Sequence, residues 1–302
     1  MPILTPNETR NLPISIALVG MPFTGKTESI ATLHTYYKRH NLPSKIHIID
    51  YDKKCDSLLR RARLDKWEDD LFIHRLFTPR GDLMSEKEIP NRSRVHAEMM
   101  IQELNSFNQY LTHDGAKWQP GQEIGAMVHD SYTEIIDNLW DGILANRGKE
   151  VGGSVAGALN RPDRRRGDEG EDIEFTEWRL LREKVIEYIK VAKSFPCDQV
   201  FTFHEEVILE EIRGQTPGAD RKVPVVSTGR RLRIPIGGTR KLSASIGKYF
   251  SIMLYTYIDD TKQGPERYRW LTRPTREIPA AGTVLRADLK DEVAQDFANV
   301  LD

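Results

Sequence analysis

The segment from Gly20 to Thr27, GMPFTGKT, carries the strongest chemical signal in the sequence. It fits the pattern G-x-x-x-x-G-K-[ST], in which glycines let the backbone turn around a phosphate so that successive N–H groups point at the anion. The Lys26 ammonium would reach the β- and γ-phosphates, and the Thr27 hydroxyl would ligate Mg²⁺. The alternative is a glycine turn with an accidental lysine. The predicted contacts with ATP are Gly20, Met21, Pro22, Phe23, Thr24, Gly25, Lys26, Thr27 and Glu28.

Phosphoryl transfer also needs a carboxylate for the metal and a group that positions the attacking water. Asp130 closes the apolar run AMVHD and is the expected second Mg²⁺ ligand, unless it only caps the following helix. Asp50 and Asp52 end the run IIDYD, where one could act as general base or both could be solvated turn carboxylates. His204 follows VFTF and could sense the γ-phosphate, although an isolated histidine beside a core strand is more often structural.

The elements that must position these residues follow an α/β pattern. The continuous apolar run at 14–19 predicts a strand buried on both faces, and the apolar spacing within 26–39 predicts a helix. A strand over 45–50 follows, so the first fifty residues predict a parallel pair with a right-handed crossover. Further predicted elements are helical material at 91–111, a strand at 124–131, a helix at 132–145, a helix at 173–195 and a strand at 199–206.

The rest of the chain divides by composition. A polar leader covers 1–13, and Gly, Arg and Asp dominate 146–172, which reads as a mobile insertion. Short β-rich pieces between 207 and 273 are separated by Gly and Pro, the pattern of antiparallel strands and hairpins. In the tail, 276–302, apolar residues four positions apart predict a helix over 287–301.

Composition limits the possible environments. A chain of 302 residues with 39% apolar residues can bury one large core, and a net charge of -1 gives the whole molecule no electrostatic reason to seek nucleic acid or acidic lipid. The two cysteines lie far apart without metal-ligand spacing, which favours neither a zinc site nor a disulfide scaffold. No run of 18 apolar residues and no secretory leader is present, so we expect a cytoplasmic protein without a membrane span.

The order of these features resembles the RecA-like ATPase core, especially the phage-encoded AAA-type ATP-binding proteins related to single-strand annealing ATPases. The resemblance covers residues 14–275 and rests mainly on the loop at Gly20–Thr27. It implies an α/β fold with a mainly parallel sheet flanked by helices, followed by C-terminal antiparallel strands and a terminal helix. It also implies that Asp52 is the catalytic base, that Asp130 pairs with Ser131 at the metal site and that His204 senses the γ-phosphate. Asp52 is shorter than the glutamate usual in this family, which bears on the rate of hydrolysis.

Residues 221–250 hold eight Lys or Arg and no acid, so positive charge is concentrated there. In RecA-like assemblies this region resembles loops that face single-stranded DNA or reach the γ-phosphate of a neighbouring subunit. The alternative is a solvated hairpin whose arginines pair with the acids of EEVILEE. The DNA-binding or trans-acting candidates are Arg230, Arg231, Arg233, Arg240, Lys241 and Lys248.

The resulting hypothesis is an ATPase that assembles into a ring or filament on single-stranded DNA in phage recombination or replication, within the host cytoplasm if the chain is phage-encoded. Three alternatives stay open. One is a packaging or assembly ATPase with a protein partner, and another is a P-loop kinase for a small metabolite. The third is a nucleotide-gated binding module that hydrolyses ATP negligibly.

Overall fold

The structure is a computed structural model. It describes residues 13–51, 54–74, 124–137, 139–140, 175–195, 197–212, 228–237, 243, 245–278, 281–283 and 289–302. Several predicted features lie outside these residues, namely the leader before Pro13, Asp52, the helical material at 91–111, the insertion at 146–172, Arg240 and Lys241.

A mainly parallel sheet forms the centre of the described structure. Its strands follow the order β11-β9-β8-β1-β5-β4-β2-β3, and β10 pairs with β8. The parallel strands are β8 (Ile252–Ile258), β1 (Ser15–Gly20), β5 (Asp198–Phe203), β4 (Ile124–Asp130), β2 (Lys45–Asp50) and β3 (Leu71–His74). The antiparallel strands are β9 (Tyr268–Leu271), β10 (Gly282–Thr283) and β11 (Glu292–Ala294). The predicted α/β class with C-terminal antiparallel strands is therefore confirmed.

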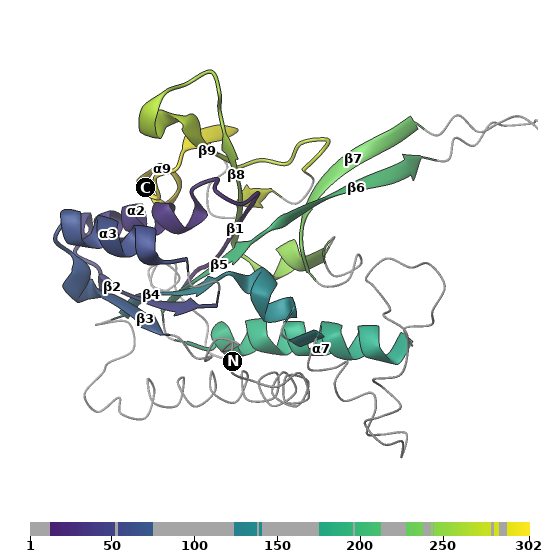
Figure 1. Ribbon diagram of the computed structural model, residues 1–302, viewed down its shortest axis with the longest axis horizontal. Helices are drawn as coiled ribbons and strands as arrows, with labels where there is room; N and C mark the ends of the chain where they lie inside the picture. The colour runs from purple at the N-terminus through teal and green to yellow at the C-terminus, as the bar shows by residue number, and fades with distance from the viewer. Residues whose placement is uncertain are drawn as a thin grey trace, which may run out of the picture.

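Helices cover both faces of this sheet (Figure 1). On one face α2 (Lys26–Arg39), α3 (Asp56–Leu64) and the short α9 (Ala298–Leu301) share one buried apolar cluster with alternate residues of the strands. On the other face α7 (Phe175–Ala192) and the helical residues 132–137 and 139–140 share a second cluster. Short 3-10 helices occupy Glu68–Asp70, Ile246–Tyr249 and Gly264–Arg267. Strands buried on both faces explain the continuous apolar runs in the sequence.

A two-stranded antiparallel sheet extends from the end of β5. It consists of β6 (Glu205–Ile212) and β7 (Thr228–Pro235), and it projects away from the main sheet (Figure 1). This ribbon confirms the predicted hairpin for this part of the chain. Because only His204 separates β5 from β6, the ribbon continues directly from the strand beside β1.

Three local predictions need correction. Strands β1 and β2 are parallel but not neighbours, since β5 and β4 lie between them. Strand β8 was expected in an antiparallel hairpin, yet it pairs in parallel with β1 on one side and antiparallel with β9 on the other. The expected helix over 287–301 is reduced to α9, because residues 292–294 form strand β11, which pairs with β9.

The sequence reading also missed α3 and β3, which extend the sheet beyond β2. Both cysteines, Cys55 and Cys197, are free and buried. Within the described ranges, no helix combines the length and the apolar character needed to cross a bilayer.

Candidate nucleotide site

Packing and backbone geometry both demand glycine at the two ends of the loop between β1 and α2. A Cβ on Gly20 would lie 2.1 Å from Oγ1 of Thr256, so the β8 strand leaves no room for a side chain there. Gly25, the residue before α2, has a φ of 86°, in the left-handed region that only glycine adopts without strain. The loop that the sequence pattern predicts is therefore fixed by close neighbours.

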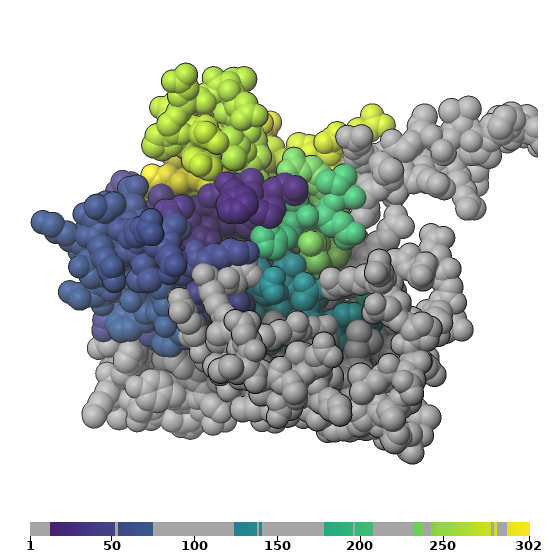
Figure 2. All heavy atoms as spheres, viewed as in Figure 1, coloured from purple at the N-terminus to yellow at the C-terminus, as the bar shows by residue number. Residues whose placement is uncertain are grey.

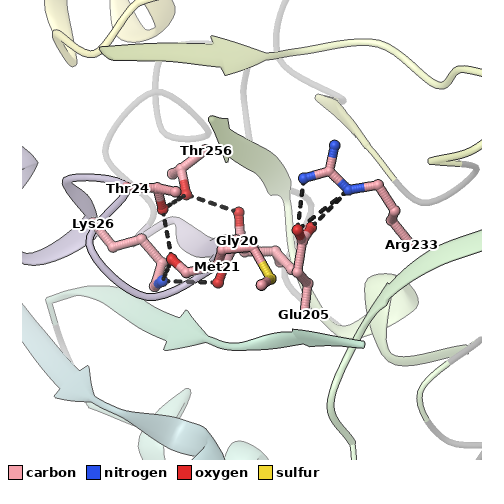
Figure 3. Close-up of polar contacts among 8 residues, drawn as sticks. Gly20, Met21, Thr24, Lys26, Glu205, Arg233 and Thr256 are labelled. Carbon is pink, nitrogen blue, oxygen red and sulfur yellow. Dashed lines mark hydrogen bonds and ion pairs between the residues drawn. The ribbon is translucent and has the colours of Figure 1, made fainter. Parts of the chain in front are cut away.

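Hydrogen bonds inside the loop hold its lysine and threonine (Figure 3). The Nζ of Lys26 donates to the carbonyl oxygens of Gly20 and Met21, both at 2.8 Å, and the side chain is buried. The Thr24 hydroxyl donates to the Met21 carbonyl at 2.8 Å and lies 2.6 Å from the Thr256 hydroxyl. The Lys26 ammonium therefore lies against the first two residues of the loop, and an anion bound by the loop would be close to this positive charge.

The outer side of the loop is exposed. Met21 is 49% exposed and Phe23 is 90% exposed, and Phe23 has a φ of 64° that is uncommon for a residue with a side chain. Pro22 and Glu28 are exposed as well. Figure 2 shows this N-terminal segment, in purple, at the surface between the blue and the green parts of the chain.

Asp130, at the carboxyl end of β4, meets the start of α2. Its Oδ2 accepts a hydrogen bond of 2.8 Å from the Thr27 hydroxyl, and its Oδ1 accepts one from the Thr202 hydroxyl on β5. The thiol of Cys55, the residue before α3, lies 3.9 Å from Oδ2. The two predicted metal ligands are therefore in direct contact, although 103 residues separate them.

The carboxyl end of β2 lies next to Asp130. Asp50 is its partner in the strand register and is buried, and the N–H of Tyr51 donates to the Asp130 carbonyl at 2.7 Å. Asp52, the predicted base, lies outside the described residues. The backbone that leads to it is nevertheless held beside Asp130.

His204 follows β5, whose Phe203 is in register with Val19. Its position is therefore beside Gly20, at the edge where the loop begins. The His204 N–H donates to the Thr133 hydroxyl at 2.9 Å, and its carbonyl accepts from the N–H of Ile236 beyond β7 at 2.9 Å. The residue thus joins the helix after Asp130 to the base of the ribbon.

The residue before Asp130, His129, belongs to the core beneath the site. Its imidazole stacks on Phe201 and its nitrogens contact the Tyr188 hydroxyl at 2.8 Å and Gln199 Oε1 at 3.1 Å. Burial lowers the pKa of His129 to about 4, against the opposing effect of the Gln199 hydrogen bond. This ring is neutral at physiological pH and supports β4 rather than carrying charge into the site.

Arg233 has a partner within the chain. Its guanidinium bonds the Glu205 carboxylate, with Nη2 2.6 Å from Oε1 and Nε 3.1 Å from Oε2, and the Glu205 side chain is only 1% exposed (Figure 3). Burial raises the pKa of nearby Tyr255, with Glu205 adding to the shift and Arg233 opposing it. The sequence leaves two alternatives for Arg233, a contact with DNA or a neighbouring subunit and a pair with an acid of the hairpin. The structure contains the second, the pair with Glu205.

The other basic candidates are spread along the chain. Arg230 and Arg231 belong to β7, opposite Glu210 and Leu209 in the strand register, and their side chains lie outside the described set. Lys248 is exposed, with Nζ 5.0 Å from the centroid of the Tyr249 ring. Of the six candidates, the structure therefore describes the side chains of Arg233 and Lys248 alone.

Three polar residues at the site were missed by sequence reasoning: Thr202, Thr256 and Gln295. Thr202 and Thr256 interrupt apolar strands, a weak signal that could have been read as side chains directed at the site, where Thr202 contacts Asp130 and Thr256 contacts Thr24. Gln295 donates through Nε2 to the Thr24 carbonyl at 2.9 Å, and nothing in its local sequence indicates this contact.

The residues present suit Mg²⁺ bound together with phosphate. That ion usually takes one or two protein oxygens and completes its shell with phosphate and water, and the Thr27 hydroxyl and the Asp130 carboxylate supply such oxygens. Across the ranges that the structure describes, no three His, Cys, Asp or Glu side chains gather into a metal site of their own. A scan against protein-family models and a search of curated proteins find no match for this chain.

Proposed function

We propose that this protein is a RecA-like P-loop ATPase that binds Mg²⁺ and ATP at Gly20–Thr27 and acts, as an oligomer, on single-stranded DNA. The observation that carries the proposal is the hydrogen bond of 2.8 Å between Thr27 and Asp130. A glycine loop alone binds many anions, whereas a loop threonine bonded to a strand-end carboxylate is suited to a metal-bound triphosphate.

In this proposal each residue has a physical task. The loop N–H groups and the N-terminus of α2 bind the phosphates, and Lys26 exchanges its contacts with the Gly20 and Met21 carbonyls for phosphate oxygens. Thr27 and Asp130 would hold Mg²⁺, and the bound ion would supply positive charge against the phosphates. Asp52 is the proposed base that would accept the proton of the attacking water, and Tyr51, the residue before it, donates its N–H to the Asp130 carbonyl.

His204 is the proposed link between nucleotide and DNA. It follows the strand next to β1 and is hydrogen-bonded to both Thr133 and Ile236. A change at the γ-phosphate would therefore act on the base of the β6–β7 ribbon. Arg230 and Arg231 on that ribbon are the proposed contacts with the sugar-phosphate backbone, because such contacts need positive charge and no base specificity.

The test is the ATPase rate with and without a single-stranded oligonucleotide, measured beside Lys26→Ala. We expect DNA to raise the rate severalfold and high salt to remove the stimulation, since phosphate contacts are screened by ions. Lys26→Ala should abolish turnover and keep the far-ultraviolet circular dichroism of the wild type. Turnover that persists in Lys26→Ala would refute the assigned site.

A protein partner is the second candidate. The Arg233 guanidinium is already paired with Glu205, and Val207 on the same ribbon is 54% exposed. An apolar exposed side chain on a projecting ribbon is more useful against a protein than against a phosphate backbone. ATPase activity that is present but indifferent to DNA at every salt concentration would favour this candidate.

A further inference from the structure

A side chain distant in sequence lies against the phosphate loop. Gln295 follows β11, and its Nε2 donates to the Thr24 carbonyl at 2.9 Å and to the Arg269 carbonyl at 3.1 Å. Its own N–H donates to the Tyr268 carbonyl at 3.2 Å. Gln295 therefore connects β9 to a loop that lies 271 residues earlier in the chain.

The contact with the Thr24 carbonyl determines where the next N–H points. In a trans peptide the C=O of one residue and the N–H of the following residue point in opposite directions. The Thr24–Gly25 bond is trans, so a carbonyl held toward Gln295 turns the N–H of Gly25 away from Gln295. Glycine itself does not fix this orientation, because it adopts positive and negative φ about equally well.

The surrounding packing makes the contact specific. A Cβ on Gly25 would lie 2.7 Å from Oε1 of Gln295 and 3.1 Å from the Tyr268 ring, so both side chains are packed on this glycine. From these observations we infer that Gln295 is a positioning residue that sets the direction of the Gly25 N–H for phosphate binding. The inference rests on the proposed function, because it assigns a task within the same site.

The segment that carries Gln295 is held by other contacts. The N–H of Phe297 donates to the Thr32 hydroxyl on α2 at 3.1 Å, and Val293, Phe297 and Val300 are buried in the cluster beneath α2. Replacing the Gln295 side chain therefore removes the bond to the loop and leaves the segment in place. Loss of binding can then be separated from loss of folding.

The experiment compares Gln295→Met with the wild type by calorimetry, using ADP and pyrophosphate, each with Mg²⁺. Methionine has nearly the same length and no N–H to donate. Asn299→Ala is the matched control, because the exposed Asn299 side chain donates to the Ala294 carbonyl at 3.3 Å in the same segment and not to the loop. Gln295→Met loses the bonds to both the Thr24 and the Arg269 carbonyls, and only the first orients the loop. We expect the variant to bind both ligands about tenfold more weakly, because the hydrogen bond that orients the Thr24 carbonyl is lost from a partly buried site, with little change in melting temperature.

The possible results separate the two levels of the proposal. Wild-type protein that binds neither ligand would refute the proposed function itself. Wild-type binding that Gln295→Met retains in full would refute the positioning role alone. Weaker ADP binding with unchanged pyrophosphate binding would also overturn it, because the contact would then concern the base or the ribose.

Discussion

Asp130 connects three segments at the scale of single residues. Its carboxylate accepts hydrogen bonds from Thr27 on α2 and Thr202 on β5, and it is 4% exposed. The negative charge is what a divalent cation needs, whereas an amide has the same size and keeps one acceptor oxygen but carries no charge. This difference allows the metal-binding role to be tested without removing the side chain.

Asp130→Asn should raise the Mg²⁺ concentration needed for half-maximal nucleotide binding by about tenfold, because the uncharged amide is a poorer ligand for a hard cation. A Mg²⁺ titration with a fluorescent ATP analogue measures this. Asp198→Asn is the control, since Asp198 accepts bonds from Tyr37 and Ile14 at the opposite end of β5. An unchanged titration for Asp130→Asn would remove this residue from the metal site.

A site residue could be predicted from the sequence when its role follows from its own segment, and not when it depends on a contact with a distant segment. Lys26 and Thr27 could be assigned from spacing because one turn of backbone places them together, and Asp130 because parallel strands end at one edge. Gln295 and Thr256 are ordinary polar residues whose contacts with Thr24 arise only from the pairing of distant strands. A single sequence contains no local record of such pairing.

At the scale of elements, an ion pair with a buried carboxylate lies at the base of the β6–β7 ribbon. The Glu205 side chain is 1% exposed and the Arg233 side chain is 28% exposed, and the N–H of Arg233 also donates to the Glu277 carbonyl at 2.8 Å. Removing one partner leaves a buried charge without compensation, which costs more than the pair itself contributes.

Arg233→Met should lower the free energy of unfolding by about 3–5 kcal/mol, and the double variant Glu205→Leu with Arg233→Met should recover most of that loss. Urea denaturation of the four proteins of the cycle measures both. The control is Arg273→Met, which removes an exposed pair: the Arg273 side chain is 49% exposed and the Asp291 side chain is 73% exposed. Its free energy of unfolding should fall by less than about 1 kcal/mol. Equal effects of Arg233→Met and Arg273→Met would contradict the buried-pair explanation.

Elements with strong local periodicity were predicted well, and those defined by their partners were not. The predicted helix at 26–39 coincides with α2, since its apolar residues repeat along one face. The partner of β8 could not be predicted, because a strand of the same composition can pair in parallel or antiparallel. In the tail, Val293 is buried as expected, but it lies in a strand opposite Trp270.

At the scale of the whole molecule, folding stability should depend on pH through buried histidines, His129 at the centre of the sheet and His47 at its outer edge. His47 on β2 lies with Nδ1 2.9 Å from Nε2 of His74 on β3, and its ring stacks on Phe72. Burial, together with the charges of His74 and Lys45, lowers the pKa of His47 from 6.5 to about 4. The unfolded chain therefore takes up a proton between pH 6.5 and pH 4 that the folded chain does not.

Stability is thus fully present above the unfolded pKa and falls as the pH falls from 6.5 toward 4. His47 should account for about 2 kcal/mol of the loss between pH 8 and pH 5. In His47→Asn, which keeps a polar group near the position of Nδ1 but does not titrate, the loss over this interval should be smaller by that amount. Urea denaturation at both pH values measures it, with His40→Asn as the control. An undiminished loss in His47→Asn would exclude this histidine as the cause.

The position of β1 in the middle of the sheet has a consequence for synthesis on the ribosome. Its neighbours are β5 and β8, and the bond between Ile14 and Asp198 already spans 184 residues. At about 5–20 residues per second, this apolar strand emerges roughly 10 to 40 s before its first neighbour is made. During that interval the apolar residues of β1 are exposed on the nascent chain and can aggregate. The yield of folded protein should therefore depend on chaperones that bind nascent polypeptides.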